Sequence, residues 1–467
     1  MEKINYIPDW AKRTTVYHIY PLGFLGAPKY SRDEESTANR LVDLRNYYSY
    51  FQELGIDTIQ FGPLFESVSH GYDTTDYFRI DHRLGTNELF KDIVNELHEL
   101  SIRVIIDGVF NHVGREFHSF KDILKNREHS QKKHWHFIDF SYNGSNTYND
   151  DFEYKNWEGH YSLVKLNLDT RDVRDHIFSA ARYWLQDIGI DGWRLDVAYL
   201  LSEDFLREFR RCCKAVKPDC FIIGEIIHGP YRKWVAGDKL DAGTGYQVYK
   251  SIWSAINDHN MFELKHVLEN SFHPQWGQNK DIVLMNFLGN HDTTRIASLL
   301  DDKRYIFPAF LLLFTLNGIP KIYYGDELGT EGVRTKTSDS DIRKPMYKDK
   351  KDWPRQADGI FNAVKKFIKL RKDNHALVHG DIVPVYADNI DSNTLAYLRR
   401  SSKQTLLVIV NTSFESANKS IPLWNQGLDG AAFVDILNND SSSYTVKNNQ
   451  LDLPLIYPCW GRILEKR

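Results

Sequence analysis

Short runs of β-branched and aromatic residues alternate with amphipathic helical runs up to about residue 375 of this 467-residue chain. Such alternation indicates βα units, in which successive strands lie parallel in one sheet. Eight strands are the number that a TIM barrel needs, so we predict an α/β fold with a (β/α)₈ barrel. The eight predicted strands are residues 15–20, 58–61, 104–107, 192–195, 221–224, 240–242, 283–287 and 321–323, of which 240–242 is the weakest candidate.

Between these strands, apolar residues recur with the spacing of a helix that buries one face. Glycine follows the first of these stripes at position 55, where it favours the end of a helix. The predicted stripes are Leu41, Leu44, Tyr48 and Phe51; Leu89, Ile93, Leu97 and Leu100; Ile177, Ala181, Trp184 and Ile188; and Phe205, Phe209, Cys212 and Val216.

Two segments depart from this alternation of strands and helices. Residues 113–167 are polar and rich in His, Asn, Asp and aromatics, and they are too many for an ordinary loop of a compact domain. From residue 376 onward, strand-like pieces are separated by Asn, Asp, Ser and Gly turns. We therefore expect a barrel of residues 1–112 and 168–375, an inserted subdomain of residues 113–167 after the third strand, and a C-terminal antiparallel β domain of residues 376–467.

Charge and cysteine content narrow the classes of partner and compartment. The net charge of −4 and the pI near 6.5 give no basic field, which argues against nucleic acid and suits an uncharged partner. The N-terminus carries charges where a signal peptide needs an apolar run, and no segment approaches membrane-spanning length. The positions of the cysteines match neither a disulfide framework nor a zinc site, so we expect reduced thiols and a cytoplasmic location. These cysteines are Cys212, Cys213, Cys220 and Cys459.

Acidic, histidine and arginine residues gather where four predicted strands end. The third strand runs into DGVFNH (107–112), the fourth into DGWRLD (191–196), the fifth into GE (224–225) and the seventh into GNHD (289–292). Barrel enzymes carry their working groups on the loops after the C-terminal ends of the strands. The four groups are therefore expected to meet at one mouth of the barrel.

Two carboxylates in this set are predicted to have opposed environments. Arg194 and Asp196 are two residues apart on an extended segment and point the same way, so the arginine favours the ionised carboxylate. Glu225 emerges from an apolar strand, where desolvation is expected to raise its pKa towards that of a general acid. An isolated Arg–Asp pair or histidine is more often structural, but their joint occurrence at successive strand ends favours a functional interpretation.

A nucleophilic carboxylate and a protonated carboxyl about 5 Å apart are what glycoside cleavage with retention requires. The oxocarbenium-like transition state also gains from a further carboxylate, for which Asp292 is the candidate. The residues themselves thus point to a glycosidase that uses Asp196, Glu225 and Asp292.

Four segments, DGVFNH, DGWRLDVA, IIGEIIH and FLGNHD, resemble the four motif regions of the α-amylase family, glycoside hydrolase family thirteen, in order and spacing. The resemblance extends through VYHIYPLGF, HGYDTTDYF, LVKLN, GIPKIYYGDELG and IRKPM, and so covers the whole chain. The chain is most similar to the neopullulanase and cyclomaltodextrinase group, whose MPKLN motif resembles LVKLN at 163–167.

The resemblance implies a role for each matching residue. Asp196 is expected to be the nucleophile, Glu225 the acid/base and Asp292 the transition-state stabiliser. In the first sugar subsite, an aromatic ring stacks on the sugar, two histidines bind its hydroxyls, an arginine orients the nucleophile, and two aspartates act as supports, one of them facing the arginine. By the same resemblance these are Tyr72, His112 and His291, Arg194, and Asp107 and Asp73, with Asp73 facing Arg194.

The chain departs from the family pattern next to these residues. Tyr199 and Leu200 stand where neopullulanase-like enzymes have Asn and Glu, and Ile227 stands where they have Trp, whereas His228 is retained. The resemblance therefore does not say which residues form the leaving-group subsites. The resemblance also leads us to expect that the N-terminal β domain through which that group dimerises is missing, so we expect a monomer or a weak homo-oligomer.

Calcium is the one metal that the resemblance raises. Asn111 matches a calcium-ligand position of α-amylases, and the insertion offers the oxygens of Asp139, Asn149 and Asp151. Solvated loop polarity explains these residues equally well. We expect no required cofactor and keep a structural calcium at Asn111 as the alternative.

The leading functional prediction is retaining hydrolysis of α-1,4-linked, and also α-1,6-linked, gluco-oligosaccharides such as maltodextrins or cyclodextrins. The alternative within the same chemistry is an exo-acting α-glucosidase or a glucanotransferase on short oligosaccharides. The alternative from another class is a catalytically inactive, amylase-like binding protein. Cleavage or non-cleavage of maltotriose separates this last alternative from the first two.

Overall fold

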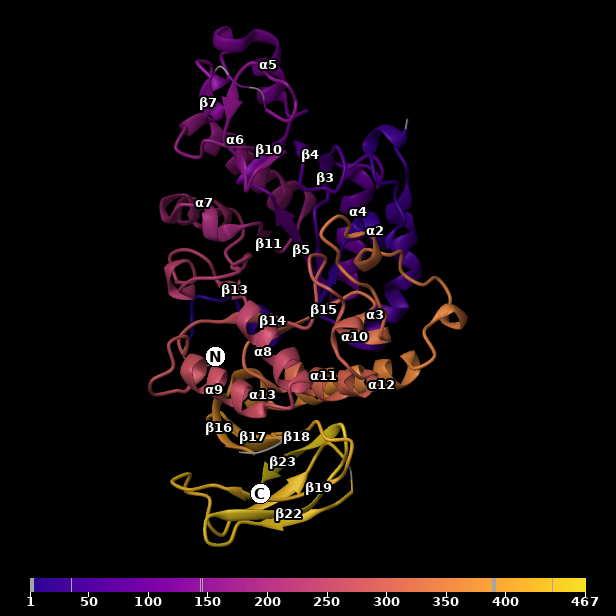
Figure 1. Cartoon of the computed structure of the whole chain (residues 1–467), viewed down its shortest axis with the longest axis vertical. Coiled ribbons are helices and arrows are strands. Elements are labelled where there is room, and N and C mark those ends of the chain that lie inside the picture. Colours follow the sequence, from indigo (N-terminus) through magenta and orange to yellow (C-terminus); the bar gives the residue numbers. More distant parts are fainter. Residues whose placement is uncertain (1–3, 35, 143, 145, 389–391, 439) are drawn as a thin grey trace.

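The computed structural model describes residues 4–34, 36–142, 144, 146–388, 392–438 and 440–467. Eight strands, all paired in parallel, close the barrel in its centre (Figure 1). Each of the eight predicted strands is present, which confirms the (β/α)₈ barrel. In spatial order they are β1 (Val16–Ile19), β2 (Thr58–Phe61), β5 (Arg103–Gly108), β11 (Gly192–Leu195), β12 (Phe221–Gly224), β13 (Ala242–Thr244), β14 (Leu284–Phe287) and β15 (Ile319–Tyr323).

Apart from Arg103 at the start of β5, the residues of the barrel strands are buried, as expected for parallel strands that helices cover on one side and the barrel interior on the other. The strand that composition marked as weakest, near residues 240–242, lies at residues 242–244 instead. Its single glycine, Gly243, packs close to the side chains of Ile226 and Val235. Its register is set by its partners β12 and β14 rather than by its own residues.

Helices surround the barrel. The second predicted stripe forms α4 (Asn87–Glu99), whose N-terminus is capped by Thr86, and the fourth forms α7 (Glu203–Val216), capped by Ser202. The first stripe begins as a 3₁₀ helix at Arg40–Tyr47 and becomes α3 (Tyr48–Leu54), and the third continues from α6 (Arg171–Tyr183) into a π-helical turn at Trp184–Ile188. The other helices are α1 (Asp9–Arg13), α2 (Pro21–Phe24), α8 (Tyr246–Asn257), α9 (Met261–Phe272), α10 (Ile296–Leu299), α11 (Ile306–Thr315), α12 (Ala357–Asp373) and α13 (His375–His379).

The insertion after β5 forms a lobe above the barrel in Figure 1. Its central sheet joins β6 (His112–Gly114), β10 (His160–Lys165) and β9 (Asn156–Trp157), all antiparallel. A second pair, β7 (Ile138–Asp139) with β8 (Glu153–Tyr154), and helix α5 (His118–Asn126) complete it. The hairpin of β3 (Phe65–Ser67) and β4 (Thr74–Ile80) follows β2 of the barrel.

The C-terminal part is an antiparallel β structure, as predicted, with a six-stranded sheet against a two-stranded one. Arg371 of α12 and Arg399 of β17 lie buried where it meets the barrel, and they donate to backbone carbonyls at the C-terminus of α11. Their charge complements the helix dipole there. The strands are β16 (Asp381–Ala387), β17 (Thr394–Arg400), β18 (Thr405–Asn411), β19 (Ala417–Pro422), β20 (Ala432–Asp435), β21 (Ser443–Thr445), β22 (Gln450–Ile456) and β23 (Trp460–Lys466).

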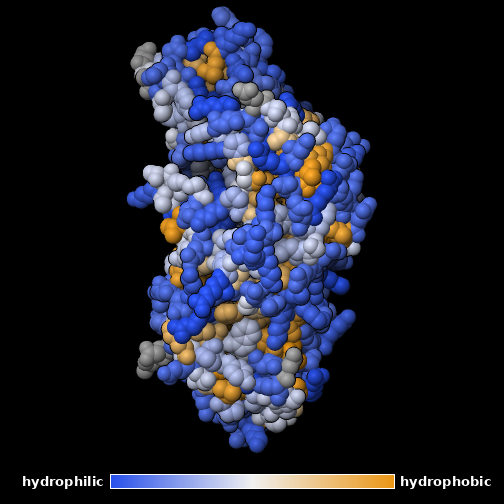
Figure 2. Space-filling view, turned by 90° about the vertical axis from the view of Figure 1, so that its right-hand side faces the viewer, coloured by the Kyte–Doolittle hydropathy of each residue, from blue (hydrophilic) through white to orange (hydrophobic). Residues whose placement is uncertain are grey.

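The surface is mostly hydrophilic, with hydrophobic residues scattered in small groups on the face that Figure 2 shows. Among the described residues, no helix combines the length and the apolar character needed to cross a bilayer.

Candidate active site

The side chain of Arg194 is the centre of the predicted site. Its Nη1 atom lies 2.9 Å from both Oδ2 of Asp107 and Oδ1 of Asp196, and its Nη2 atom lies 2.8 Å from Oε1 of Glu225. Arg194 and Asp107 are direct partners in the parallel register of β11 and β5, so both side chains point towards the same mouth. The structure therefore brings together the predicted groups from the ends of three neighbouring strands.

The carboxylate of Glu225 is held on several sides. Its Oε2 atom accepts from the backbone N–H of Val197 at 3.0 Å, and its Oε1 atom accepts from the hydroxyl of Tyr246 at 3.2 Å. The apolar surroundings expected from the strand sequence are thus only part of its environment, because three donors, including Arg194, also reach it. Tyr246 was not among the predicted site residues, since it follows the weakest strand and carries no charge.

Asp292 follows β14 and lies against a histidine and an arginine. Its Oδ2 atom lies 2.9 Å from Nε2 of His291, and its Oδ1 atom lies 3.0 Å from Nη2 of Arg343. Burial alone would raise the pKa of Asp292, but His291, Arg343 and Arg194 hold it well below its usual range. Asp292 is therefore a carboxylate, as stabilisation of a positive charge requires. Arg343 belongs to the IRKPM segment, but sequence reasoning assigned it no role.

Asp196 is subject to opposed influences. Burial raises the pKa of Asp196 well above its usual range; Arg194 opposes the shift, and the neighbouring carboxyls of Glu225 and Asp107 add to it. Arg194 thus favours the ionised form of Asp196, as expected, but one guanidinium is shared by three carboxyls. Protons in such a cluster belong to the group and not to a single residue.

The aspartate predicted to face Arg194 is also placed differently. Asp73 accepts hydrogen bonds from the backbone and hydroxyl of Ser69, the first of them 3.1 Å long. Arg194 pairs with Asp107, Asp196 and Glu225 instead. The expected contact between Asp73 and Arg194 is therefore wrong, because Asp73 lies on the loop before β4, where its local partners satisfy it.

A cavity of about 610 Å³ opens above these carboxylates, a size that encloses ligands as large as a short oligosaccharide. Asp196, Glu225 and Asp292 all line it. Of the residues predicted to contact the sugar, Tyr72 and His112 line it too, whereas His291, Arg194 and Asp107 lie behind its wall. The other lining residues are His70, Trp157, Glu158, His160, Ser162, Leu163, Val197, Tyr199, Ile227, His228, Tyr246, Thr293, Arg334, Asp339 and Arg343.

The rings of Tyr72 and His291 lie against each other. Their rings stack with centroids 5.3 Å apart, and the hydroxyl of Tyr72 bonds both Nε2 of His291 and, at 3.1 Å, Oδ2 of Asp107. His291 thus supports Tyr72 and Asp292 from behind. Its Nε2 atom contacts Tyr72 and Asp292, and its Nδ1 atom is buried without a partner among the described residues, so the sugar-binding role that the resemblance implied for His291 stays a prediction.

His112 is set up as a hydrogen-bond donor. The side-chain amide of Asn111 lies 3.2 Å from its Nδ1 atom, so Nδ1 accepts and Nε2 carries the proton. Burial lowers the pKa of His112 to about 3, which keeps the ring neutral. Its Nε2 atom is buried without a hydrogen-bond partner among the described residues.

Two of the residues named for a calcium site have partners of their own. Asp139 accepts from Ser141, and Asp151 pairs with Arg127, whereas at Asn111 it is the amide nitrogen that faces His112. A structural calcium at Asn111 stays a prediction.

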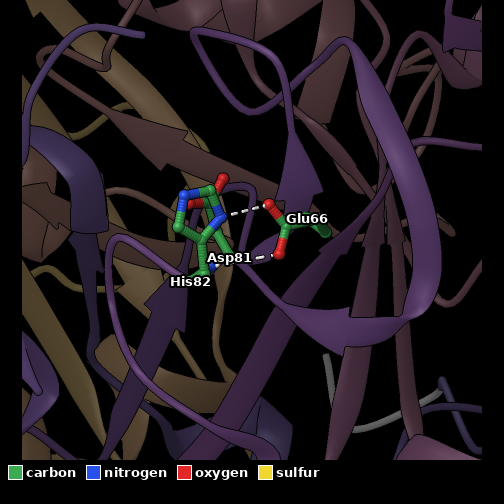
Figure 3. Close-up of side chains that lie close together, drawn as sticks. All are labelled: Glu66, Asp81 and His82. Carbon is green, nitrogen blue, oxygen red and sulfur yellow. Dashed lines mark hydrogen bonds and ion pairs between the residues drawn. The ribbon is translucent and has the colours of Figure 1, made fainter. Parts of the chain in front are cut away.

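Among the described residues, one other group could hold a metal ion, formed by Glu66, Asp81 and His82 (Figure 3). Both ring nitrogens of His82 face acceptors: Nδ1 lies 2.5 Å from Glu66, and Nε2 lies 3.2 Å and 3.1 Å from two backbone carbonyls. The protonated form of His82, in which both nitrogens donate and neither has a lone pair for a metal, suits these partners best. Asp81 is occupied by Arg83 through two hydrogen bonds, so this group is an ion-pair network.

Comparison with known proteins agrees with this geometry. A family model described as the catalytic domain of alpha amylase matches residues 41–380. The chain is 35% identical over 438 residues to a cyclomaltodextrinase of Geobacillus thermopakistaniensis, covering 90% of this chain and 72% of that protein. It is 32% identical over 480 residues to neopullulanase 2 of Thermoactinomyces vulgaris, with coverage of 98% and 78%. Its fold matches the crystal structure of Ttha1563 from Thermus thermophilus with a TM-score of 0.84, at 28% identity and 98% and 100% coverage.

Proposed function

Because this chain belongs to the α-amylase family and is a glycosidase of α-glucans, we propose that it works with retention, using Asp196 as nucleophile and Glu225 as acid/base. The observation that carries this proposal is the sharing of Arg194. The two carboxyls bind neighbouring nitrogens of one guanidinium, and Glu225 also accepts from the residue directly after Asp196. This closeness favours direct attack, because an inverting pair stands about 6.5–9.5 Å apart to admit a water molecule.

In the first step, a carboxylate oxygen of Asp196 forms a bond to the anomeric carbon while the bond to the glycosidic oxygen breaks. Glu225 gives its proton to that oxygen, and the shortened sugar leaves as an alcohol. In the second step, Glu225 takes a proton from water, the oxygen of that water bonds to the anomeric carbon, and Asp196 departs as a carboxylate. The substrate gains one water and the enzyme returns unchanged.

The pair needs one proton at the start, and it must reside on Glu225. Carboxyls crowded around one guanidinium hold a proton more readily than isolated ones, as the raised pKa of Asp196 indicates. When the glycosidic oxygen of the substrate lies at Glu225, it accepts a hydrogen bond from the protonated form of Glu225 and so favours the proton on that residue. Arg194 then stabilises the anionic Asp196. Asp292, kept ionised by Arg343, offers negative charge to the oxocarbenium-like transition state.

The substrates that we propose are maltodextrins or cyclodextrins joined by α-1,4 links, with α-1,6 links as further substrates. Tyr72 and the Nε2–H of His112 would contact the sugar on the non-reducing side of the cut. The reaction as written requires no cofactor. The four cysteines are free thiols, which supports the cytoplasm as the proposed location.

The test is to follow products and their anomeric form. We would incubate the enzyme with maltotriose, maltoheptaose, β-cyclodextrin, pullulan and isomaltose, and record the first product by proton NMR. The expected result is cleavage of α-1,4 links with the α-anomer formed first. Initial β-anomer would overturn retention, and the absence of any cleavage would support the inactive binding protein instead.

A further inference from the structure

The tip of the hairpin β9–β10 reaches the cavity from the inserted subdomain. Trp157 and His160 are paired across the strands, so Glu158 and Gly159 form a two-residue turn. Both have positive φ, +48° for Glu158 and +87° for Gly159, as the primed hairpin turns require. Glu158 and both flanking residues, Trp157 and His160, line the catalytic cavity.

Glutamate is an unusual residue for this turn. Its first position favours Asn, Asp or Gly, because a longer side chain makes the left-handed conformation unfavourable. Glu158 is exposed, so packing does not explain its presence. A residue held in an unfavourable backbone conformation at a cleft suggests that its side chain has a function there.

The carboxylate of Glu158 reaches across the cleft to the barrel. Its Oε1 atom accepts a hydrogen bond of 3.3 Å from the hydroxyl of Tyr199, which we call the Glu158–Tyr199 bridge. The ring of Tyr199 is supported from the other side by His228, with centroids 5.1 Å apart. Tyr199 follows Asp196 by three residues and His228 follows Glu225 by three, so the bridge begins beside both catalytic carboxyls.

The position of the strands tells which end of the cleft the bridge closes. Tyr199 and His228 follow β11 and β12, whereas Asp292 and Arg343 follow β14 and β15 on the far side of the barrel. The leaving group lies on the side of the acid that protonates it, which is the side of Glu225. The bridge therefore spans the leaving-group end of the cleft.

We propose that Glu158 and Tyr199 are specificity-determining residues whose bridge limits how many sugars the leaving-group side accepts. The inference rests on the proposed function. A leaving group of one glucose fits between the bridge and the carboxyls, while a longer chain must break the bridge. Short linear malto-oligosaccharides are then the preferred substrates over long or cyclic ones.

The chemistry of the pair suits sugar hydroxyls. Tyr199 gives its proton to Glu158, so its oxygen still accepts, and the second oxygen of the carboxylate is open to another donor. Trp157 adds a platform: its ring stacks on His160 with centroids 5.3 Å apart, and its Nε1 atom is buried without a partner among the described residues. A leaving-group sugar can exchange these bonds for its own.

The experiment compares kcat and KM of the wild type, Y199F and E158A on maltotriose, maltoheptaose and β-cyclodextrin. Loss of the bridge should raise the ratio of kcat/KM for maltoheptaose over maltotriose about three- to tenfold, as expected for one lost hydrogen bond. The change should lie in KM, with kcat on maltotriose kept within about twofold. E158Q retains an acceptor oxygen for Tyr199 and should behave as the wild type.

A matched control lies in the same subdomain. The hydroxyl of Tyr161 donates to Glu153 at 3.1 Å, and neither residue lines the cavity, so Y161F removes an equivalent hydrogen bond away from the cleft. Y161F should leave the ratio unchanged. An unchanged ratio in both Y199F and E158A, or an equal change in Y161F, would overturn the inference while the enzyme still cleaves maltotriose. A wild type that cleaves none of the three would overturn the proposed function itself.

Discussion

The backbone N–H of Val197 donates a hydrogen bond of 3.0 Å to Oε2 of Glu225. Val197 directly follows the proposed nucleophile, and its φ of +38° is rare for a β-branched residue. Its N–H faces Glu225, so the backbone after one proposed catalytic residue positions the other. Strain of this kind persists where the surrounding structure enforces it, and Val197 is buried.

Replacing Asp196 with Asn should reduce kcat at least about a thousandfold, because an amide cannot form the glycosyl ester. Folding should be retained, since Asn has nearly the same volume and the change relieves crowding among buried carboxyls. Thermal melting of the purified variant checks the second point. Activity close to that of the wild type would reject Asp196 as nucleophile.

Replacing Glu225 with Gln should depend on the leaving group. Natural oligosaccharides need a proton on the departing oxygen, whereas the 4-nitrophenolate of an activated glycoside leaves without one. The loss of kcat/KM should therefore be much smaller on the activated substrate. The measurement is kcat/KM for maltotriose and for 4-nitrophenyl-α-maltoside in both proteins. Equal losses on the two would count against Glu225 as the acid.

Replacing Tyr72 with Ala should weaken sugar binding by about 1 kcal/mol or more through lost ring stacking. Y72F keeps the ring and removes the hydroxyl that reaches Asp107, so it separates stacking from hydrogen bonding. Titration calorimetry with maltotriose in an Asp196→Asn background would measure binding without turnover. Affinity unchanged in Y72A would place the sugar away from this ring.

His82 should make the stability depend on pH. Burial opposes its charge, but Glu66 and a backbone carbonyl raise the pKa of His82 above 6.5 in the folded protein. A raised folded pKa adds stability that is fully present below the unfolded pKa and is lost as pH rises through the folded pKa. Replacing His82 with Gln should therefore cost about 1 kcal/mol near pH 5.5 and less near pH 9.

Urea unfolding of the wild type and of H82Q at both pH values measures that difference. H98Q is a useful comparison, since His98 pairs with Asp191 at the opposite side of the barrel strands. A cost for H82Q that is the same at both pH values would show that His82 acts without its charge.

The barrel and the identity of the acidic residues followed from local features. Each strand is a short buried run whose residues favour extended structure, and the groups that follow it must emerge at one mouth because parallel strands end together. The weak sixth strand shows where the local sequence no longer suffices to place a strand. Its central glycine has little preference for extended structure, and the position of the strand depends on the neighbouring strands.

The pairing of charges could not be predicted in the same way. Asp107 and Asp73 are equivalent in sequence terms, yet the register of β5 with β11 brings Asp107 to Arg194 and leaves Asp73 with Ser69. The proton affinity of Asp196 depends on how many carboxyls share one guanidinium in a buried space, which is a property of distances between strands.

By itself the sequence determined the eight-stranded barrel, the position of the insertion and the acids at the strand ends, because hydrophobic period and chain order suffice for these. Only the tertiary structure decided that His291 lies behind Tyr72, that Val197 contacts Glu225, and that the hairpin tip carrying Glu158 meets Tyr199. Each of these contacts joins residues whose distance is set by packing of separate elements, and no local pattern in the chain encodes such a distance.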